Sequence, residues 1–278
     1  MRLFSKTYIN DFEWLKLAIK TVWHFSKEEV KWTFVIEDEN LEQLRDLVLK
    51  TPSDGSKGFG VGSIQFSFHG LNELWPEAKQ ISQGYLRQQW IKMNAHRVMG
   101  NDFFMNWDSD VIAVRPFIID YFKGRSGRPI HWFTDYNHMI MTERDPTAVT
   151  AYQSRRALAG KIYGWPISFE WMRCMPMPGF GEILRCGAGT QYWSHMFELC
   201  KSATPGFSEF NFIGEYAHKF FPDAFEWRNA ENSGPTWSTG YITKSEDLPI
   251  EFQSHGIVCQ GWSYGGIPPN LKKWVDAL

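Results

Sequence analysis

The first fifty residues alternate between short apolar runs and amphipathic patterns, and this alternation constrains the fold more than any other feature. Residues 2–8 and 31–36 are rich in apolar, aromatic and β-branched side chains, which predicts two strands. Residues 12–25 and 41–49 carry apolar side chains at helical spacing, which predicts two amphipathic helices. Strands that alternate with helices at this pace are typical of βαβ units. The sequence therefore predicts an α/β fold with a mostly parallel sheet.

Farther along the chain, an apolar run ends in two closely spaced carboxylates. Residues 103–107 are followed at once by Asp108, Ser109 and Asp110, and apolar residues resume at Val111. This pattern predicts a buried strand that carries both carboxylates to its end, where ligands of open α/β sheets bind. Carboxylate oxygens suit Mg²⁺ or Mn²⁺ held against a diphosphate. Because Asp-Ser-Asp is also good turn chemistry, a plain turn is the alternative interpretation.

The rest of the chain predicts a series of shorter elements. Strands are expected at residues 63–68 and 129–136. Helices are expected at residues 83–99, 118–122, 145–160, 191–201 and 209–220, with Thr190 and Ser208 as caps of the last two. Residues 51–62 are Gly-rich and predict a loop, residues 165–189 predict irregular structure, and the tail from residue 225 predicts loops and short strands. One compact domain with an irregular C-terminal half is the simplest organisation.

Composition excludes some classes of function and favours a compartment. The chain has 278 residues and a net charge of −2, so no global basic field attracts nucleic acid or anionic membranes. Aromatic residues make up 17% of the chain, and we expect some of them to line a binding cleft. Four cysteines without zinc-site spacing, no apolar signal region and no membrane-spanning stretch predict a cytoplasmic protein.

Four stretches of the chain resemble the GT-A class of nucleotide-sugar glycosyltransferases and, more closely, a poorly characterised bacterial and phage group of GT-A-like proteins. They are residues 6–12, 84–92, 104–117 and 207–211, of which the third contains Asp108-Ser109-Asp110 as the counterpart of the DXD motif. The resemblance implies one GT-A (Rossmann-like) domain over residues 1–278, with a mostly parallel central sheet flanked by helices. Residues 1–120 would bind the nucleotide sugar and metal, and residues 121–278 would form an irregular acceptor-binding half with a C-terminal loop.

The resemblance also implies roles for particular residues. Asp108, Asp110 and His255 would hold Mn²⁺ or Mg²⁺, with Asp108 also on the donor side. Residues expected to face the nucleotide sugar, with a UDP-sugar as first choice, are Thr7, Tyr8, Gln88, Gln89 and Lys92. The acceptor would be a glycan, a protein or a hydroxymethylated DNA base.

An inverting transferase also needs a carboxylate base to deprotonate the acceptor hydroxyl. Asp135 at a predicted strand end and Glu209 at a predicted helix start are the candidates, and Glu170 is a further one. A glutamate in the first turn of a helix also complements the helix dipole, which is the structural alternative for Glu209. A retaining enzyme would need no such base, so the stereochemistry stays open.

The sequence thus favours a metal-dependent hexosyl- or pentosyltransferase that moves a sugar from a nucleoside-diphosphate sugar to an acceptor hydroxyl. Two alternatives are a binding module for nucleotide sugars or glycans without turnover, and a metal-dependent nucleotidyltransferase or phosphohydrolase. A DNA acceptor would require a basic and aromatic groove. The residues available for one are Arg144, Arg155, Arg156, Lys161, Arg173, Tyr152, Trp165 and Trp171.

Overall fold

The computed structural model describes residues 1–51, 63–113, 116–171, 176–230, 267 and 269–278. The chain divides into two compact units. Unit 1 comprises residues 1–74, 105–121 and 235–278, and unit 2 comprises residues 75–104 and 122–234. None of the described helices combines the length and the apolarity needed to cross a membrane.

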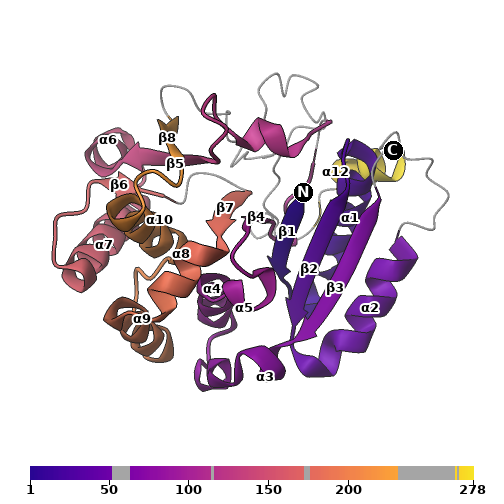
Figure 1. The fold of residues 1–278 in the computed structure, drawn as a ribbon, viewed down its shortest axis with the longest axis horizontal. Helices are drawn as coiled ribbons and strands as arrows, with labels where there is room; N and C mark the ends of the chain where they lie inside the picture. Colours follow the sequence, from indigo (N-terminus) through magenta and orange to yellow (C-terminus); the bar gives the residue numbers. More distant parts are fainter. Residues whose placement is uncertain (52–62, 114–115, 172–175, 231–266, 268) are drawn as a thin grey trace. The chain divides into compact units, whose positions relative to one another are not determined.

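Unit 1 is built on parallel strands (Figure 1). The strands are β1 (Arg2–Lys6), β2 (Val30–Ile36), β3 (Ile64–Gly70) and β4 (Phe103–Asn106), the last of which begins in unit 2. β1 pairs in parallel with both β2 and β4, and β2 pairs in parallel with β3. With β7 (Met177–Phe180) the sheet has five strands, in the order β3-β2-β1-β4-β7.

Helices cover the sheet of unit 1. They are α1 (Phe12–Phe25), α2 (Leu41–Lys50), the short α3 (Leu71–Leu74) and α12 (Pro269–Asp276). α2 contacts both α1 and β3, and α12 packs against α1, where Phe25 and Trp274 stack with ring centroids 6.1 Å apart. Almost every residue of β2 is buried, as expected for a strand inside a parallel sheet that is covered on both faces.

Unit 2 is mostly helical. Its helices are α4 (Gly84–Met93), α5 (His96–Met99), α6 (Tyr136–Thr142), α7 (Pro146–Tyr163), α8 (Gly181–Ala188), α9 (Gln191–Lys201) and α10 (Glu209–Phe220). A second sheet has the order β6-β5-β8, formed by β6 (Phe169–Glu170), β5 (Ile130–Asp135) and β8 (Glu226–Asn229). α10 contacts α4, α7 and α8, and its first nine residues are all buried. This helix therefore forms the centre of unit 2.

Short 3-10 helices complete the described elements. They lie at Ile9–Asp11, Asp38–Asn40, Pro76–Gln80 and Ile119–Phe122.

The structure confirms the α/β class, the parallel strands and the first two helices. Ser208 caps α10 as predicted, since its hydroxyl accepts a hydrogen bond from the Asn211 N–H at 3.5 Å. Thr190 stands at the N-cap of α9 but makes no side-chain capping bond. The Gly-rich loop at 51–62 lies, from residue 52 on, outside the described residues, and so does most of the tail. The organisation as one domain stays a prediction.

Several element predictions were wrong. The helix expected at 83–99 breaks after Met93, where the Asn94 side-chain amide donates to the Trp90 carbonyl at 2.9 Å. The segment expected to be an α-helix at 118–122 is a 3-10 helix over Ile119–Phe122. α6 and α12 were not predicted.

The largest error concerns residues 165–189, expected to be irregular. They contain β6, β7 and the helix α8. The glycines there permit close packing and do not interrupt the regular secondary structure. A Cβ on Gly181 would collide with the Gly100 carbonyl, and a Cβ on Gly187 would collide with the Trp193 ring.

The packing of α10 against Trp171 generates a first prediction. Gly214 lies within α10, and a Cβ there would collide with the Trp171 side chain, which is fully buried. We expect Gly214→Ala to lower the free energy of unfolding by about 1–3 kcal/mol, the usual cost of overpacking a core. Urea denaturation measures this change.

Gly160 in α7 provides the matched control. A Cβ at this position would lie 3.4 Å from its nearest neighbour, the Trp165 carbonyl oxygen, which is an ordinary contact. Gly160→Ala should therefore be neutral or stabilise the protein by up to about 1 kcal/mol through helix propensity. Equal effects of the two substitutions would contradict the packing argument.

Candidate functional site

Unit 1 gathers acidic side chains where β1 and β4 end. We call Asp11, Asp108 and Asp110 the acidic cluster. The Trp107 N–H donates to the Phe4 carbonyl at 2.8 Å, which continues the pairing of β4 with β1 as far as the acidic turn. The Ser109 hydroxyl then donates to the Thr7 hydroxyl at 2.9 Å. This contact joins the segments that leave two neighbouring parallel strands, at the edge where such sheets bind ligands.

Asp108 and Asp110 lie on either side of the buried Ser109 in a tight turn. The Val111 N–H donates to the Asp108 carbonyl at 3.0 Å, which closes the turn. Both carboxyl-bearing residues are half-buried. The alternative interpretation of this motif as a turn is therefore correct for its backbone, and the turn itself presents the two acids at the end of the strand.

No sequence pattern indicated Asp11 as a member of this cluster. It stands at the N-cap of α1 but makes no side-chain capping bond. Burial raises the pKa of Asp11, the positive charge of Lys6 opposes this rise, and the negative charge of Asp108 adds to it. A carboxyl group with a raised pKa beside a second carboxylate is a place where a cation lowers the electrostatic energy.

The oxygen donors of the cluster fit a hard divalent cation that takes its other ligands from elsewhere. In the described part of the chain, no group of three or more His, Cys, Asp or Glu side chains is arranged to hold a metal alone. Mg²⁺ and Mn²⁺ commonly bind through one or two carboxylates, with phosphate and water completing the shell. Asp108 and Asp110 match that requirement. The third expected ligand, His255, lies outside the described residues.

Lys6, which the sequence analysis did not single out, stands beside the residues expected to meet the nucleotide. Its buried ammonium donates to the Thr7 carbonyl at 2.6 Å and to both Glu37 carboxylate oxygens at 3.1 Å. It also lies 3.6 Å from the centroid of the Tyr8 ring. Thr7 is buried, whereas Tyr8 is half-buried. Glu37 directly follows β2. Because ligands of open α/β sheets bind where the strands end, its position predicts contact with a ligand, as that of Asp108 does.

Unit 2 holds a second group of ionisable side chains, centred on a buried ion pair. The Lys92 ammonium of α4 lies 3.2 Å from the Glu209 carboxylate of α10, and both side chains are only 4% exposed. The same ammonium lies 4.7 Å from the centroid of the Phe210 ring. Two residues expected to contact substrate thus contact each other. The pair cancels charge that would otherwise be costly inside the protein.

A second buried carboxylate, Glu170, joins the same region. It accepts a hydrogen bond from the Asn211 side-chain amide at 3.0 Å and lies 3.9 Å from the Arg155 guanidinium. The Asn211 side-chain oxygen in turn accepts from the Trp171 backbone N–H at 2.7 Å, which ties the residue after β6 to the first turn of α10. The pKa of the buried Tyr136 hydroxyl is raised, first by burial and then by the charge of Glu170.

Gln89 and Tyr85 complete this group, since they share a face of α4 with Lys92. Gln89 is only 1% exposed, and among the described residues neither atom of its amide group has a hydrogen-bond partner. A buried amide left in this state costs about 1–3 kcal/mol. Tyr85 is 63% exposed overall, but its hydroxyl end is enclosed. Burial of that end, followed by the charge of Glu209, raises its pKa. Gln88, the other expected glutamine, is half-buried.

We call the following residues the polar cluster of unit 2: Tyr85, Gln89, Lys92, Tyr136, Arg155, Glu170, Glu209 and Asn211. Arg155 connects the part of the cluster that contains Tyr85 with the part that contains Tyr136. Its charge lowers the pKa of Tyr85 on one side and that of Tyr136 on the other.

Asp135, the other candidate base, has a structural task. One of its carboxylate oxygens accepts hydrogen bonds from the Asn137 and His138 N–H groups, at 2.8 and 3.0 Å, and so caps α6. Sequence reasoning placed Asp135 at a strand end but did not predict the helix that follows it.

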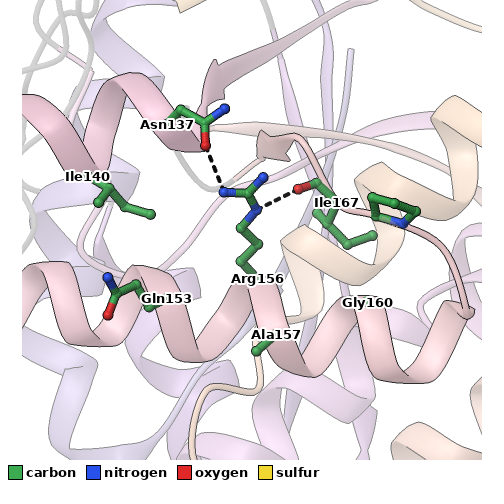
Figure 2. A pocket seen from close by; sticks show the side chains of 8 residues that line it. Asn137, Ile140, Gln153, Arg156, Ala157, Gly160 and Ile167 are labelled. Carbon is green, nitrogen blue, oxygen red and sulfur yellow. Dashed lines mark hydrogen bonds between the residues drawn. The ribbon is translucent and has the colours of Figure 1, made fainter.

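A surface groove of about 530 Å³ lies between α6 and α7 (Figure 2). The Arg156 guanidinium crosses it, donating to the Asn137 side-chain oxygen at 2.8 Å and to the Ile167 carbonyl at 2.7 Å. Arg155 faces Glu170, and Arg173 lies outside the described residues. Two of the basic residues considered for contact with DNA are thus held by other parts of unit 2.

Comparison with known proteins places the chain in a family. A family model described as a family of unknown function, DUF6492, matches residues 1–158. The chain belongs to this family. The part that matches DUF6492 contains the acidic cluster and Lys92 but ends before Glu170 and Glu209.

Other comparisons add little to the DUF6492 match. No curated protein matches the chain. Among solved structures, it is similar to mouse xyloside xylosyltransferase 1 in its apo form, at 13% identity, with 82% of this chain and 85% of that chain covered and a TM-score of 0.46. A likeness of this size carries no weight for the activity.

Asp11 generates a prediction about pH. Because its pKa is raised in the folded state, its ionisation opposes folding above that pKa and has no effect where both states are protonated. Asp11→Asn should therefore increase stability at pH 7, and the gain should disappear below the ordinary pKa of aspartate, near 4. Urea denaturation between pH 3 and pH 8 measures the effect. A gain that grows toward acid would contradict the assignment.

The Lys92–Glu209 pair generates another prediction. Removing either charge alone, by Lys92→Met or Glu209→Leu, takes away the counterion that lies 3.2 Å from the other buried charge and should destabilise the protein by about 3–5 kcal/mol. The double variant Lys92→Met/Glu209→Leu should recover most of that loss, because it removes both charges. A double-mutant cycle in urea checks this. Additive losses would show that the two side chains act independently.

Proposed function

We propose that this protein is a metal-dependent glycosyltransferase that moves a hexosyl or pentosyl group from a nucleoside-diphosphate sugar to an acceptor hydroxyl. The acidic cluster carries the proposal: the negative charge of Asp108 raises the pKa of Asp11, and Asp110 follows Asp108 in the same turn. Such a concentration of negative charge repels a bare diphosphate and favours one that arrives with a divalent cation. The position at the end of parallel strands supports the same interpretation.

In this proposal Asp108 and Asp110 hold Mn²⁺ or Mg²⁺, and His255 is a further candidate ligand from the resemblance. An ion bound there would supply positive charge that offsets the charge on a departing nucleoside diphosphate. Tyr8 offers an aromatic face to the base or ribose. The Lys6 ammonium lies over the same ring, 3.6 Å from its centroid. Thr7 holds the acidic turn through its contact with Ser109. A UDP-sugar is the first donor to test.

For the acceptor side we favour Glu209 over Asp135 as the base of an inverting reaction, because Asp135 already caps α6. Gln88, Gln89 and Lys92 remain candidates for contacts to the sugar. Of these, Gln89 and Lys92 are the better supported, since both belong to the polar cluster of unit 2.

The test is release of nucleoside diphosphate. The purified protein is incubated with Mn²⁺ and a panel of nucleotide sugars, with and without candidate acceptors. We expect release from one donor, abolished by a chelator and reduced about 100-fold or more in Asp110→Ala, since a catalytic metal contributes several kcal/mol of charge stabilisation. Asp46→Ala, which removes an exposed carboxylate paired with Lys50, should behave as wild type.

Other outcomes identify the alternatives. Donor binding without release, even with acceptors present, would indicate a binding module. Release of pyrophosphate or of inorganic phosphate would indicate a nucleotidyltransferase or a phosphohydrolase. Equal release by wild type and Asp110→Ala would overturn the role of the acidic cluster.

A further inference from the structure

The charges of the polar cluster of unit 2 balance one another. Lys92 pairs with Glu209 at 3.2 Å, and Arg155 faces Glu170 at 3.9 Å. An anion that entered this region would meet two carboxylates, and a cation would meet two positive groups. A neutral ligand that can both donate and accept hydrogen bonds is the kind of ligand this balance favours.

Gln89 shows that the cluster is incomplete within the described part of the chain. Its amide is buried, and no described residue forms a hydrogen bond with either its oxygen or its nitrogen. The Tyr85 hydroxyl lies close enough for its interaction with this amide to lower the Tyr85 pKa, but neither amide atom reaches hydrogen-bond geometry with it. An amide offers an acceptor oxygen and a nitrogen with two donor hydrogens, both bonded to one carbon. Neighbouring hydroxyl groups on a sugar ring match this combination, because each hydroxyl both donates and accepts.

Tyr85 supplies an aromatic surface at the same place. It lies one helical turn before Gln89 on α4 and is the exposed member of the cluster, at 63%. Exposed tyrosine rings stack on the apolar faces of sugars. The exposed ring and the buried amide are thus neighbours on one face of α4.

We infer that the polar cluster of unit 2 binds ring hydroxyls of a neutral sugar, with Gln89 as the central hydrogen-bonding group and Tyr85 as the stacking surface. Under the proposed function, on which this identification rests, the acceptor is an uncharged glycan. Nucleic acid and acidic glycans are disfavoured, because Arg155 and Arg156 are already engaged by Glu170, Asn137 and the Ile167 carbonyl.

The experiment measures glycan binding to the full-length protein without nucleotide or metal, and again with UDP and Mn²⁺. The probes are a panel of neutral oligosaccharides, the same panel carrying sulfate or uronic acid groups, and duplex DNA. We expect at least one neutral oligosaccharide to bind, more tightly than its acidic counterparts and DNA. Gln89→Leu should weaken this binding about tenfold, and Tyr85→Ala should weaken it while Tyr85→Phe retains most of it.

Stability separates a binding role of Gln89 from a structural one. Because the amide has no hydrogen-bond partner among the described residues, Gln89→Leu should leave the melting temperature unchanged or raise it. The matched control is Gln83→Leu. Gln83 is an exposed glutamine at the start of the same helix, and its side chain makes no capping bond. This control should bind as wild type does.

Several results would overturn the inference: unchanged binding in Gln89→Leu, a marked fall in its melting temperature, preference for acidic glycans or DNA, or no neutral glycan bound under either condition. Asp110→Ala separates it from the proposed function. That variant should lose donor turnover yet keep glycan binding in the metal-free state. Absence of donor turnover in wild type with glycan binding intact would count only against the proposed function.

Discussion

The parallel pairing of β1 with β2 and β4 is the constraint on which the acidic cluster depends. Strands that run in the same direction deliver the segments after them to one edge of the sheet. The register that sets Phe4 opposite Asn106 therefore brings Thr7 beside Ser109, although 102 residues separate them. The backbone arrangement alone gathers carboxylates from two distant segments, and the side chains need only be acidic to make the edge attractive to a cation.

Unit 2 differs from unit 1 in that its charged side chains are buried in ion pairs among aromatic rings. Apolar residues of similar volume could fill the space of Lys92 and Glu209 with equal or greater stability, so stability alone does not explain the pair. The same holds for Glu170, which needs Asn211 and Arg155 around it. We therefore attribute the polar groups in the first turn of α10 to the binding role proposed for this cluster.

Sequence patterns predicted the elements whose signal is local. The run at 31–36 and the amphipathic pattern at 41–49 gave a strand and a helix with nearly correct bounds, and the acids after β4 follow from an apolar run that ends abruptly. The break at Asn94 depends on a side chain that bonds the backbone one turn earlier, and α8 depends on Gly181 fitting against Gly100. Likewise Lys92 and Glu209 were identified singly, while their contact is tertiary and has no local signal.

The two buried ion pairs also constrain how this family can vary. Each pair joins a cation within residues 1–158, the part matched by the family, to an anion beyond it. A lineage that replaced Glu170 or Glu209 by a neutral residue would remove a buried anion that pairs with Arg155 or Lys92. Substitutions on the two sides should therefore be inherited together. The chain beyond residue 158 is thus tied to the segment matched by the family through these two ion pairs.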